Sequence, residues 1–276
     1  MNLEFPSMID FGLEPAAEVL ARAFEDYFVR IPSTVGVLLN MARADSVDLT
    51  LSRVFVRDGA AVGGALIARR GWTCRLAGMA IVPNARRGGI GRAAVLHLLD
   101  KAKARGDRTM VLEVIEQNTA ALKLYRACGF KEIRRLVGFA GPPVPDANLA
   151  TELVEVDLRE VAEAVTRYGL PDLPWQLSGE TLAQFTPPGV AYRLNGAWIA
   201  LSDPAQPVGT IRGLIAEPAA QGAGREAALL RAVMAKHPRK DEWRLSALWP
   251  EEFASVIGPA GLPRSPLTQL QMQREV

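Results

Sequence analysis

The stretch that decides the fold is MAIVPNARRGGIGR, residues 79–92, where an apolar run ends at a proline and a basic, glycine-rich loop leads into a helix. Unpaired backbone N–H groups at the start of a helix point outward and add to the helix dipole, so they attract anions. Glycines without a Cβ let a phosphate approach the main chain closely. Arg86, Arg87 and Arg92 add positive charge, and no acidic residue stands among them. The stretch predicts a phosphate-binding turn between a strand and a helix.

Taken alone, this loop fits more than one interpretation. Residues 89–94, GIGRAA, match the dinucleotide pattern G-x-G-x-x-A, which is a weak signal by itself. A plain glycine-rich turn into a helix is the commoner case. The segment that follows, NTAALKLYRACGF at residues 118–130, separates the interpretations, because Rossmann folds do not require its pattern of Asn, Leu-Tyr and Gly-Phe.

Together the two segments resemble the GNAT superfamily of acetyl-CoA-dependent acyltransferases. The family signature R/Q-x-x-G-x-G/A matches Arg86, Gly89 and Gly91, while Arg87 and Gly88 reverse the usual order of a small and then a basic residue. The resemblance covers roughly residues 10 to 140. The family's continuation N-x-x-A-x-x-L-Y-x-x-x-G-F matches Asn118, Ala121, Leu124, Tyr125, Gly129 and Phe130.

The resemblance implies that acetyl-CoA is the cosubstrate, and it assigns roles to residues of both segments. Asn118 is expected to bind the coenzyme or an ordered water. The plainer alternatives are a helix N-cap for Asn118 and half-buried packing for Tyr125. Tyr125 falls where the family has its general acid, and a phenol of pKa about 10 can protonate a thiolate whose thiol has a pKa of about 8.5. The main chain of Met79, Ala80 and Ile81 is expected to bind the pantetheine arm, and an N–H of that strand the oxyanion. The coenzyme diphosphate is expected on Arg86, Arg87, Gly88, Gly89, Ile90, Gly91 and Arg92.

A protonated amine acceptor must lose a proton before it attacks, so a general base is needed. The strand at 74–82 has no carboxylate. Glu113 precedes Tyr125 by 12 residues, an arrangement similar to that of the ribosomal-protein alanine acetyltransferases, where such a glutamate is the base. Glu113 is also readable as a solvated strand residue. Glu116, Glu25 or a chain of waters would be next.

The first 29 residues carry an excess of acidic side chains, six against the single base Arg22. In the family this region lines the acceptor side, so an acidic lining with Phe24, Tyr27 and Phe28 favours a cationic small-molecule or peptide amine, although such a helix face is often only solvated. Packing is the expected role of Cys128, and neither histidine receives a role. The acids are Glu4, Asp10, Glu14, Glu18, Glu25 and Asp26.

The composition excludes several classes of protein. The 276 residues, 49% hydrophobic and 22% charged, are typical of a globular protein of about two domains. A formal net charge of +2 gives no general attraction to nucleic acid or membranes, and we expect neither as a partner. Two cysteines and two histidines predict no metal site and no disulfide framework. Without a signal peptide or a long apolar run, the chain is expected to be cytoplasmic, and a homodimer stays open.

The order of elements predicts an α/β (α+β) fold with a mixed sheet. The resemblance implies two tandem GNAT-like domains, each a mixed, mostly antiparallel sheet flanked by helices. A helix is expected at 15–28, hairpin strands between 49 and 82, and then a helix at 89–104, a strand at 109–116, a helix at 119–127 and a strand at 131–137. The proline-rich segment 141–145 is the strongest break. We expect a catalytic domain at 1–142 and a degenerate GNAT-like domain at 150–276.

The second half repeats the first imperfectly. The run 214–218 corresponds to 79–83, after which Gln221 and Gly224 match Arg86 and Gly89. Glu226 replaces Gly91 and places a carboxylate where a phosphate would bind. The tyrosine and asparagine positions hold Ile257 and Pro250. We expect one working site, with the second copy serving as scaffold, interface or acceptor wall.

The leading hypothesis is an N-acetyltransferase that moves the acetyl group of acetyl-CoA to a primary amine by direct transfer in a ternary complex. A non-catalytic acyl-CoA-binding or interaction module is the alternative, and a dinucleotide-binding oxidoreductase the third. Tyr125 and Asn118 beside an intact loop argue against the second, and the 118–130 pattern argues against the third.

Overall fold

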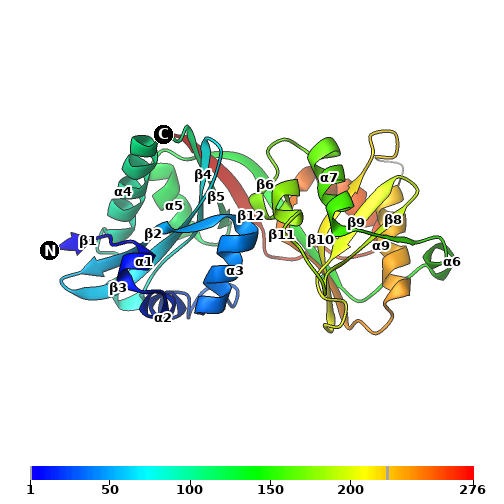
Figure 1. Ribbon diagram of the computed structural model, residues 1–276, viewed down its shortest axis with the longest axis horizontal. Coiled ribbons are helices and arrows are strands. Elements are labelled where there is room, and N and C mark those ends of the chain that lie inside the picture. Colours follow the sequence, from blue (N-terminus) through cyan, green and yellow to red (C-terminus); the bar gives the residue numbers. More distant parts are fainter. Residues whose placement is uncertain (1, 222–223) are drawn as a thin grey trace. The chain divides into compact units, whose positions relative to one another are not determined.

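The computed structural model describes residues 2–221 and 224–276, which form two compact units (Figure 1). Unit 1 contains the chain up to Val114, Asn118–Ile133 and Gln271–Val276. Unit 2 contains Ile115–Gln117 and Arg134–Leu270. Neither unit is a single continuous stretch of chain.

Unit 1 is a mixed sheet with helices packed on it. Its strand order is β1-β2-β3-β4-β5-β12, in which β4 and β5 are parallel while β1–β2, β2–β3 and β3–β4 are antiparallel. Helix α2 packs on β3 and β4, and α4 packs on β4 and α5. The elements are β1 (Leu3–Glu4), α1 (Met8–Phe11), α2 (Leu13–Ala23), α3 (Val35–Asp45), β2 (Val47–Arg57), β3 (Ala60–Arg70), β4 (Thr73–Ile81), η1 (Pro83–Ala85), α4 (Ile90–Arg105), β5 (Thr109–Ile115), α5 (Thr119–Ala127) and β12 (Gln269–Glu275).

Unit 2 repeats this plan with the strand order β6-β11-β10-β9-β8-β7, in which only the β10–β11 pair is parallel among the described pairs. The elements are β6 (Lys131–Gly141), α6 (Ala147–Ala150), β7 (Val154–Val156), α7 (Leu158–Tyr168), η2 (Trp175–Leu177), α8 (Gly179–Leu182), β8 (Val190–Leu194), β9 (Ala197–Leu201), β10 (Val208–Ala216), α9 (Arg225–Lys236), β11 (Glu242–Pro250), η3 (Glu251–Phe253), α10 (Ala254–Ile257) and η4 (Gly258–Ala260).

The sheet of unit 2 is covered on both faces. Side chains of a strand alternate between the two faces. Tyr192 and Ile199 share a buried cluster with α9, whereas their neighbours Ala191 and Ala200 share a second cluster with α7. Helices α9 and α7 therefore bury opposite faces of the same strands.

The two units exchange a strand. From Arg134 onward β6 belongs to unit 2, where it pairs with β11. From Gln271 onward β12 belongs to unit 1, where it is the neighbour of β5. Each half of the chain thus supplies the strand that completes the sheet formed by the other half.

The predicted α/β fold with mixed, mostly antiparallel sheets is confirmed, and α4 and α5 lie close to the predicted ranges. The first long helix, α2, ends at Ala23, and Phe24 caps it, so it is shorter than predicted. The segment 141–145 lies entirely within unit 2. The division into 1–142 and 150–276 stays a prediction, because compactness does not test which stretch folds independently. Within residues 2–221 and 224–276, no helix is both long and apolar enough to cross a membrane.

Candidate functional site

The loop before α4 presents backbone donors that have no acceptor. Gly89 begins the helix at φ 80° and Arg87 has φ 65°, both in the left-handed region, and no side chain caps the helix. In the described part of the chain, the N–H groups of residues 87–92 have no hydrogen-bond acceptor. Arg87 and Arg92 are exposed and contribute charge beside these donors. The loop has the form of an anion site built from main chain.

Gly91 lies where the first turn of α4 packs closely against α5 and β4. A Cβ at this position would lie 3.2 Å from Cδ2 of Leu124 on α5 and 3.5 Å from Cδ1 of Ile81 on β4. The first turn of α4 therefore fits tightly against both neighbours, with Ile90 buried beside it. A larger side chain at position 91 must therefore displace α5 or occupy the space beside the free N–H groups of residues 87–92.

Arg86 anchors the loop and is not free for a phosphate. Its Nε donates to the carbonyl of Ile81 at 2.8 Å, and its Nη atoms bond both carboxylate oxygens of Asp26 at 2.6 Å. A further bond reaches the carbonyl of Ala23 at 3.2 Å. The hydrogen bond from Arg86 lowers the pKa of Asp26, so the pair is ionised at neutral pH. The arginine of the signature thus ties the loop to the ends of β4 and α2.

Strand β4 separates from β5 beside this loop. The register with β3 shifts between Leu66 and Ile67, which leaves Ala77 as an extra, bulged residue in β4. The β4–β5 pairs run from Thr73 to Arg75, and no later pair is found in the described chain. Met79, Ala80 and Ile81 lie beyond this point and are half-buried. Their main chain is paired with β3 on one side and is available to a ligand on the other.

Asn118 is the N-cap of α5, and Tyr125 lies further along the same helix. The side chain of Tyr27 lies near both. Tyr125 is 6% exposed, and burial raises the pKa of its phenol above the usual range, which keeps it protonated as a donor. Asn118 caps α5 by accepting the N–H of Ala121 at 3.2 Å. It also hydrogen-bonds the hydroxyl of Tyr27, whose pKa is raised by burial. The sequence predicts Tyr27 only as part of the acceptor lining, because no local motif indicates that it lies near Tyr125.

Glu113 is held in a buried ion pair that the sequence did not reveal. Its Oε2 accepts from Nε of Arg75 at 2.8 Å and lies 2.7 Å from Nη2, and the two side chains are 4% and 5% exposed. Its Oε1 is buried and has no hydrogen-bond partner in the described chain. Glu113 is therefore not a solvated strand residue, and one of its oxygens keeps the capacity to accept a proton.

The next candidate base is already engaged. Glu116 belongs to unit 2 and accepts from Oγ1 of Thr268 at 2.6 Å and from Nε of Arg135 at 2.8 Å. These hydrogen bonds, first that of Thr268, lower the pKa of Glu116, which makes it a weaker base. In contrast, every other predicted catalytic or coenzyme-binding residue belongs to unit 1.

The remaining reactive side chains are packed. Cys128 is buried, and burial raises the pKa of its thiol, which disfavours the thiolate. His97 stacks on Phe5 with ring centroids 4.4 Å apart, and His237 bonds the Tyr192 hydroxyl at 3.0 Å. Among the residues described, no group of three potential ligands is placed to hold a metal ion.

Unit 2 resembles unit 1 at the start of the corresponding helix but carries different side chains there. Gly224 begins α9 at φ 76°, and Gln221 donates to the carbonyl of Ala216 at 2.9 Å, as Arg86 does to Ile81. The register of β10 also shifts, between Ile211 and Gly213, at the position that corresponds to Ala77. Glu226 occupies the position of Gly91 and is buried.

Comparisons with known proteins agree with this geometry. The model of the acetyltransferase (GNAT) family matches residues 18–130. Over 59 residues, 21% of this chain, the sequence is 46% identical to the [ribosomal protein bS18]-alanine N-acetyltransferase of Escherichia coli, of which the match covers 40%. It is 37% identical over 84 residues, 29% of this chain, to streptothricin acetyltransferase of Streptomyces lavendulae, of which the match covers 44%. The chain thus spans less than half of these curated relatives.

Solved structures extend the likeness to both units. A tandem GNAT protein from the clavulanic acid biosynthesis pathway matches with a TM-score of 0.67 and 17% identity, covering 99% of this chain and 98% of that one. A GCN5-related N-acetyltransferase from Sphaerobacter thermophilus matches with a TM-score of 0.71 and 17% identity, covering 99% and 95%. At such identity the likeness shows the fold. The chain has the fold of the tandem GNAT proteins, and its residues 18–130 form a domain of the acetyltransferase (GNAT) family.

Proposed function

We propose that unit 1 is an N-acetyltransferase that transfers the acetyl group of acetyl-CoA directly to a primary amine in a ternary complex. The observation that carries the proposal is the row of unsatisfied N–H groups at residues 87–92 beside the opened edge of β4. A diphosphate satisfies these donors, and an extended amide-bearing arm fits a strand edge. The donor set of unit 1 therefore suits coenzyme A.

The proposed chemistry uses main chain for binding and two side chains for protons. The amine nitrogen attacks the acetyl carbonyl carbon, and the carbon–sulfur bond breaks. An N–H on the free edge of β4 stabilises the oxyanion, and the thiolate takes a proton from Tyr125. The acceptor ammonium gives one proton to Oε1 of Glu113, the oxygen that Arg75 leaves free, before the attack. The second nitrogen proton, released as the amide forms, passes to the Tyr125 phenolate and restores the phenol.

The acceptor class is narrower than the family as a whole. The names of the curated relatives describe a ribosomal protein alanine and streptothricin as acceptors. Both acceptors offer an amine, so we propose either a peptide N-terminus or a small-molecule amine. Asp26, one of the acids expected to attract a cation, is neutralised by Arg86, which leaves Glu25 as an exposed carboxylate beside it.

The test is an acetylation assay with the full chain and acetyl-CoA. A peptide beginning with alanine and streptothricin are the probes, with thiol release and a product heavier by one acetyl group as the readouts. Tyr168→Phe, in unit 2, is the matched control for Tyr125→Phe. Acetyl-CoA, and not NADH, is expected to raise the melting temperature. Coenzyme binding without acetylation of any amine would instead support a non-catalytic acyl-CoA-binding module.

A further inference from the structure

Unit 2 contains a cavity of about 290 Å³ at its degenerate loop. Residues from α7, the α9 loop and the β11–α10 connection line it. The rings of Tyr168 and Phe253 and the side chains of Leu170 and Val256 give it apolar walls. Glu226 and Glu252 add two carboxylates. The volume is that of a small ligand site and is too small to enclose a whole coenzyme.

Glu226 is the unusual member of this lining. Glu226 is only 3% exposed, and its Oε2 has no hydrogen-bond partner in the described chain. Burial raises the pKa of Glu226, as expected for a carboxyl removed from water without a counter-ion. A buried carboxyl without a hydrogen-bond partner or counter-ion destabilises the folded state unless a bound ligand supplies that partner.

The other charges of the cavity do not supply that partner. Arg134 is the cation of the lining, and its guanidinium is bonded to Asp172 and lies 3.7 Å from Glu252. These two acids already balance Arg134, so the described lining leaves no cation to pair with Glu226. Gln221, the remaining polar residue, donates to the carbonyls of Ala216 and Tyr168. A phosphate entering here would face Glu226 and Glu252.

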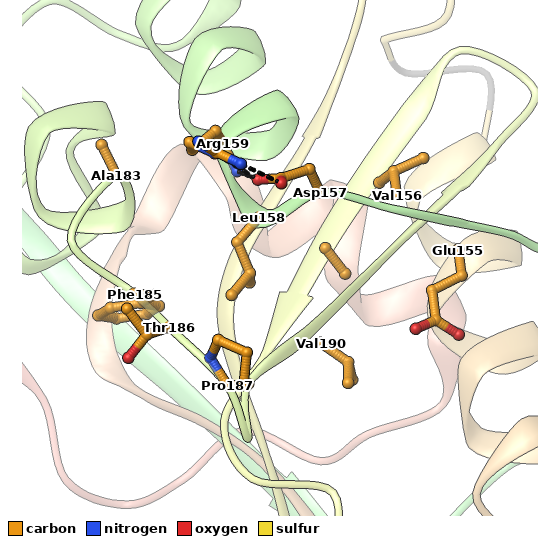
Figure 2. Close-up of a pocket in the computed structure, with 12 residues that line it drawn as sticks. Glu155, Val156, Asp157, Leu158, Arg159, Ala183, Phe185, Thr186, Pro187 and Val190 are labelled. Atoms are coloured by element: carbon orange, nitrogen blue, oxygen red, sulfur yellow. Dashed lines mark hydrogen bonds and ion pairs between the residues drawn. The ribbon is translucent and has the colours of Figure 1, made fainter.

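A second cavity of unit 2 has a carboxylate on its rim that is already paired within the chain. It is larger, about 440 Å³, and Figure 2 shows Asp157 and Arg159 on its rim joined by dashed lines. The Asp157 carboxylate accepts from the Arg159 guanidinium at 2.6 and 2.8 Å and from its backbone N–H. The carboxylate of Asp157 has its partner within the chain, so the size of a cavity alone does not indicate a ligand.

We propose that the cavity at Glu226 binds a protonated primary amine with an apolar body, and that the degenerate copy is an amine-binding module. The ammonium pairs with Glu226, with Glu252 nearby, and the body packs between Tyr168 and Phe253. The Nε of Arg134 is also buried without a partner, so an oxygen acceptor on the same ligand has a donor to bond. The proposal does not depend on the activity of unit 1.

The test is calorimetry on the full chain with three probes of similar shape: phenethylamine, 2-phenylethanol and 3-phenylpropanoate. We expect the amine to bind at least tenfold more tightly than the alcohol and the acid to bind least. Glu226→Gln removes the charge and should lower amine affinity at least tenfold, whereas Glu155→Gln, a carboxylate on the rim of the other cavity, should leave it unchanged. This comparison also subtracts any amine bound in unit 1.

Two further readouts guard against a merely damaged variant. Phe253→Ala keeps the carboxylate and removes one wall, so it should lower affinity for the amine and the alcohol alike. Glu226→Gln relieves an unpaired buried charge, so its melting temperature should equal or exceed that of the wild type. Equal binding of amine and alcohol, or amine affinity unchanged in Glu226→Gln, would overturn the proposal.

Discussion

Helices α4 and α9 start alike but differ in the charge of their first turns. Both start a helix at a left-handed glycine, Gly89 or Gly224, after a strand with a shifted register. One position separates them most: Gly91 in unit 1 and the buried Glu226 in unit 2. A similar helix start therefore carries different charges in the two units, so fold likeness does not say which copy works.

Transferring the second loop's residue to the first is expected to have the largest effect. Gly91→Glu puts a carboxylate beside the donors of residues 87–92, where it repels the diphosphate and crowds Leu124. Coenzyme affinity measured by calorimetry should fall by roughly 10³-fold or more, since like charges in contact cost several kcal/mol. Gly91→Ala isolates the steric part and should lose much less. Unchanged affinity in Gly91→Glu would remove the coenzyme from this loop.

Removing the proposed proton donor, Tyr125, is expected to have the second-largest effect. Tyr125→Phe keeps the buried ring against Phe130 but removes the hydroxyl, so turnover should fall by roughly 10² to 10⁴-fold with little change in coenzyme affinity. Tyr27→Phe tests the neighbouring hydroxyl in the same assay. Full turnover by Tyr125→Phe in a single-turnover measurement would show that this phenol only packs.

A matched pair of variants separates the base from its ion pair. Glu113→Gln and Arg75→Gln both break the buried contact and should both lower the melting temperature. Only Glu113→Gln removes the carboxylate, and its turnover should fall by about 10²-fold at low pH. It should partly recover as the pH rises and free amine becomes abundant. If the two variants share one pH profile, the base lies elsewhere.

The smallest effects are expected from the two anchoring side chains. Arg86→Ala frees the loop from Asp26 and from the end of β4, so coenzyme affinity should fall about tenfold, or about 1.4 kcal/mol. Gln221→Ala removes the equivalent bond in unit 2 and should leave turnover unchanged. A tenfold loss of turnover or of coenzyme affinity in Gln221→Ala would mean that the second loop takes part in the reaction.

The sequence predicted what depends on local pattern. The order of elements, the glycine start of α4 and the cap of α5 by Asn118 follow from spacing and residue type. Long-range partners have no such signal, which is why the commitment of Arg86 to Asp26 and the Arg75–Glu113 pair were not foreseen. Strand exchange was not foreseen either, because β6 and β12 suit a sheet of either unit.

That exchange has a consequence for the nascent chain. Synthesis reaches Ile133 about 140 residues before it supplies Gln271–Val276, and at 5–20 residues per second the interval is roughly 7 to 28 seconds. Throughout that time β5 lacks the neighbour that it has in the finished sheet, and an unpaired strand edge invites association with other chains. Unit 2 is therefore hard to discard, because the ribosome delivers the last strand of unit 1 only after translating unit 2.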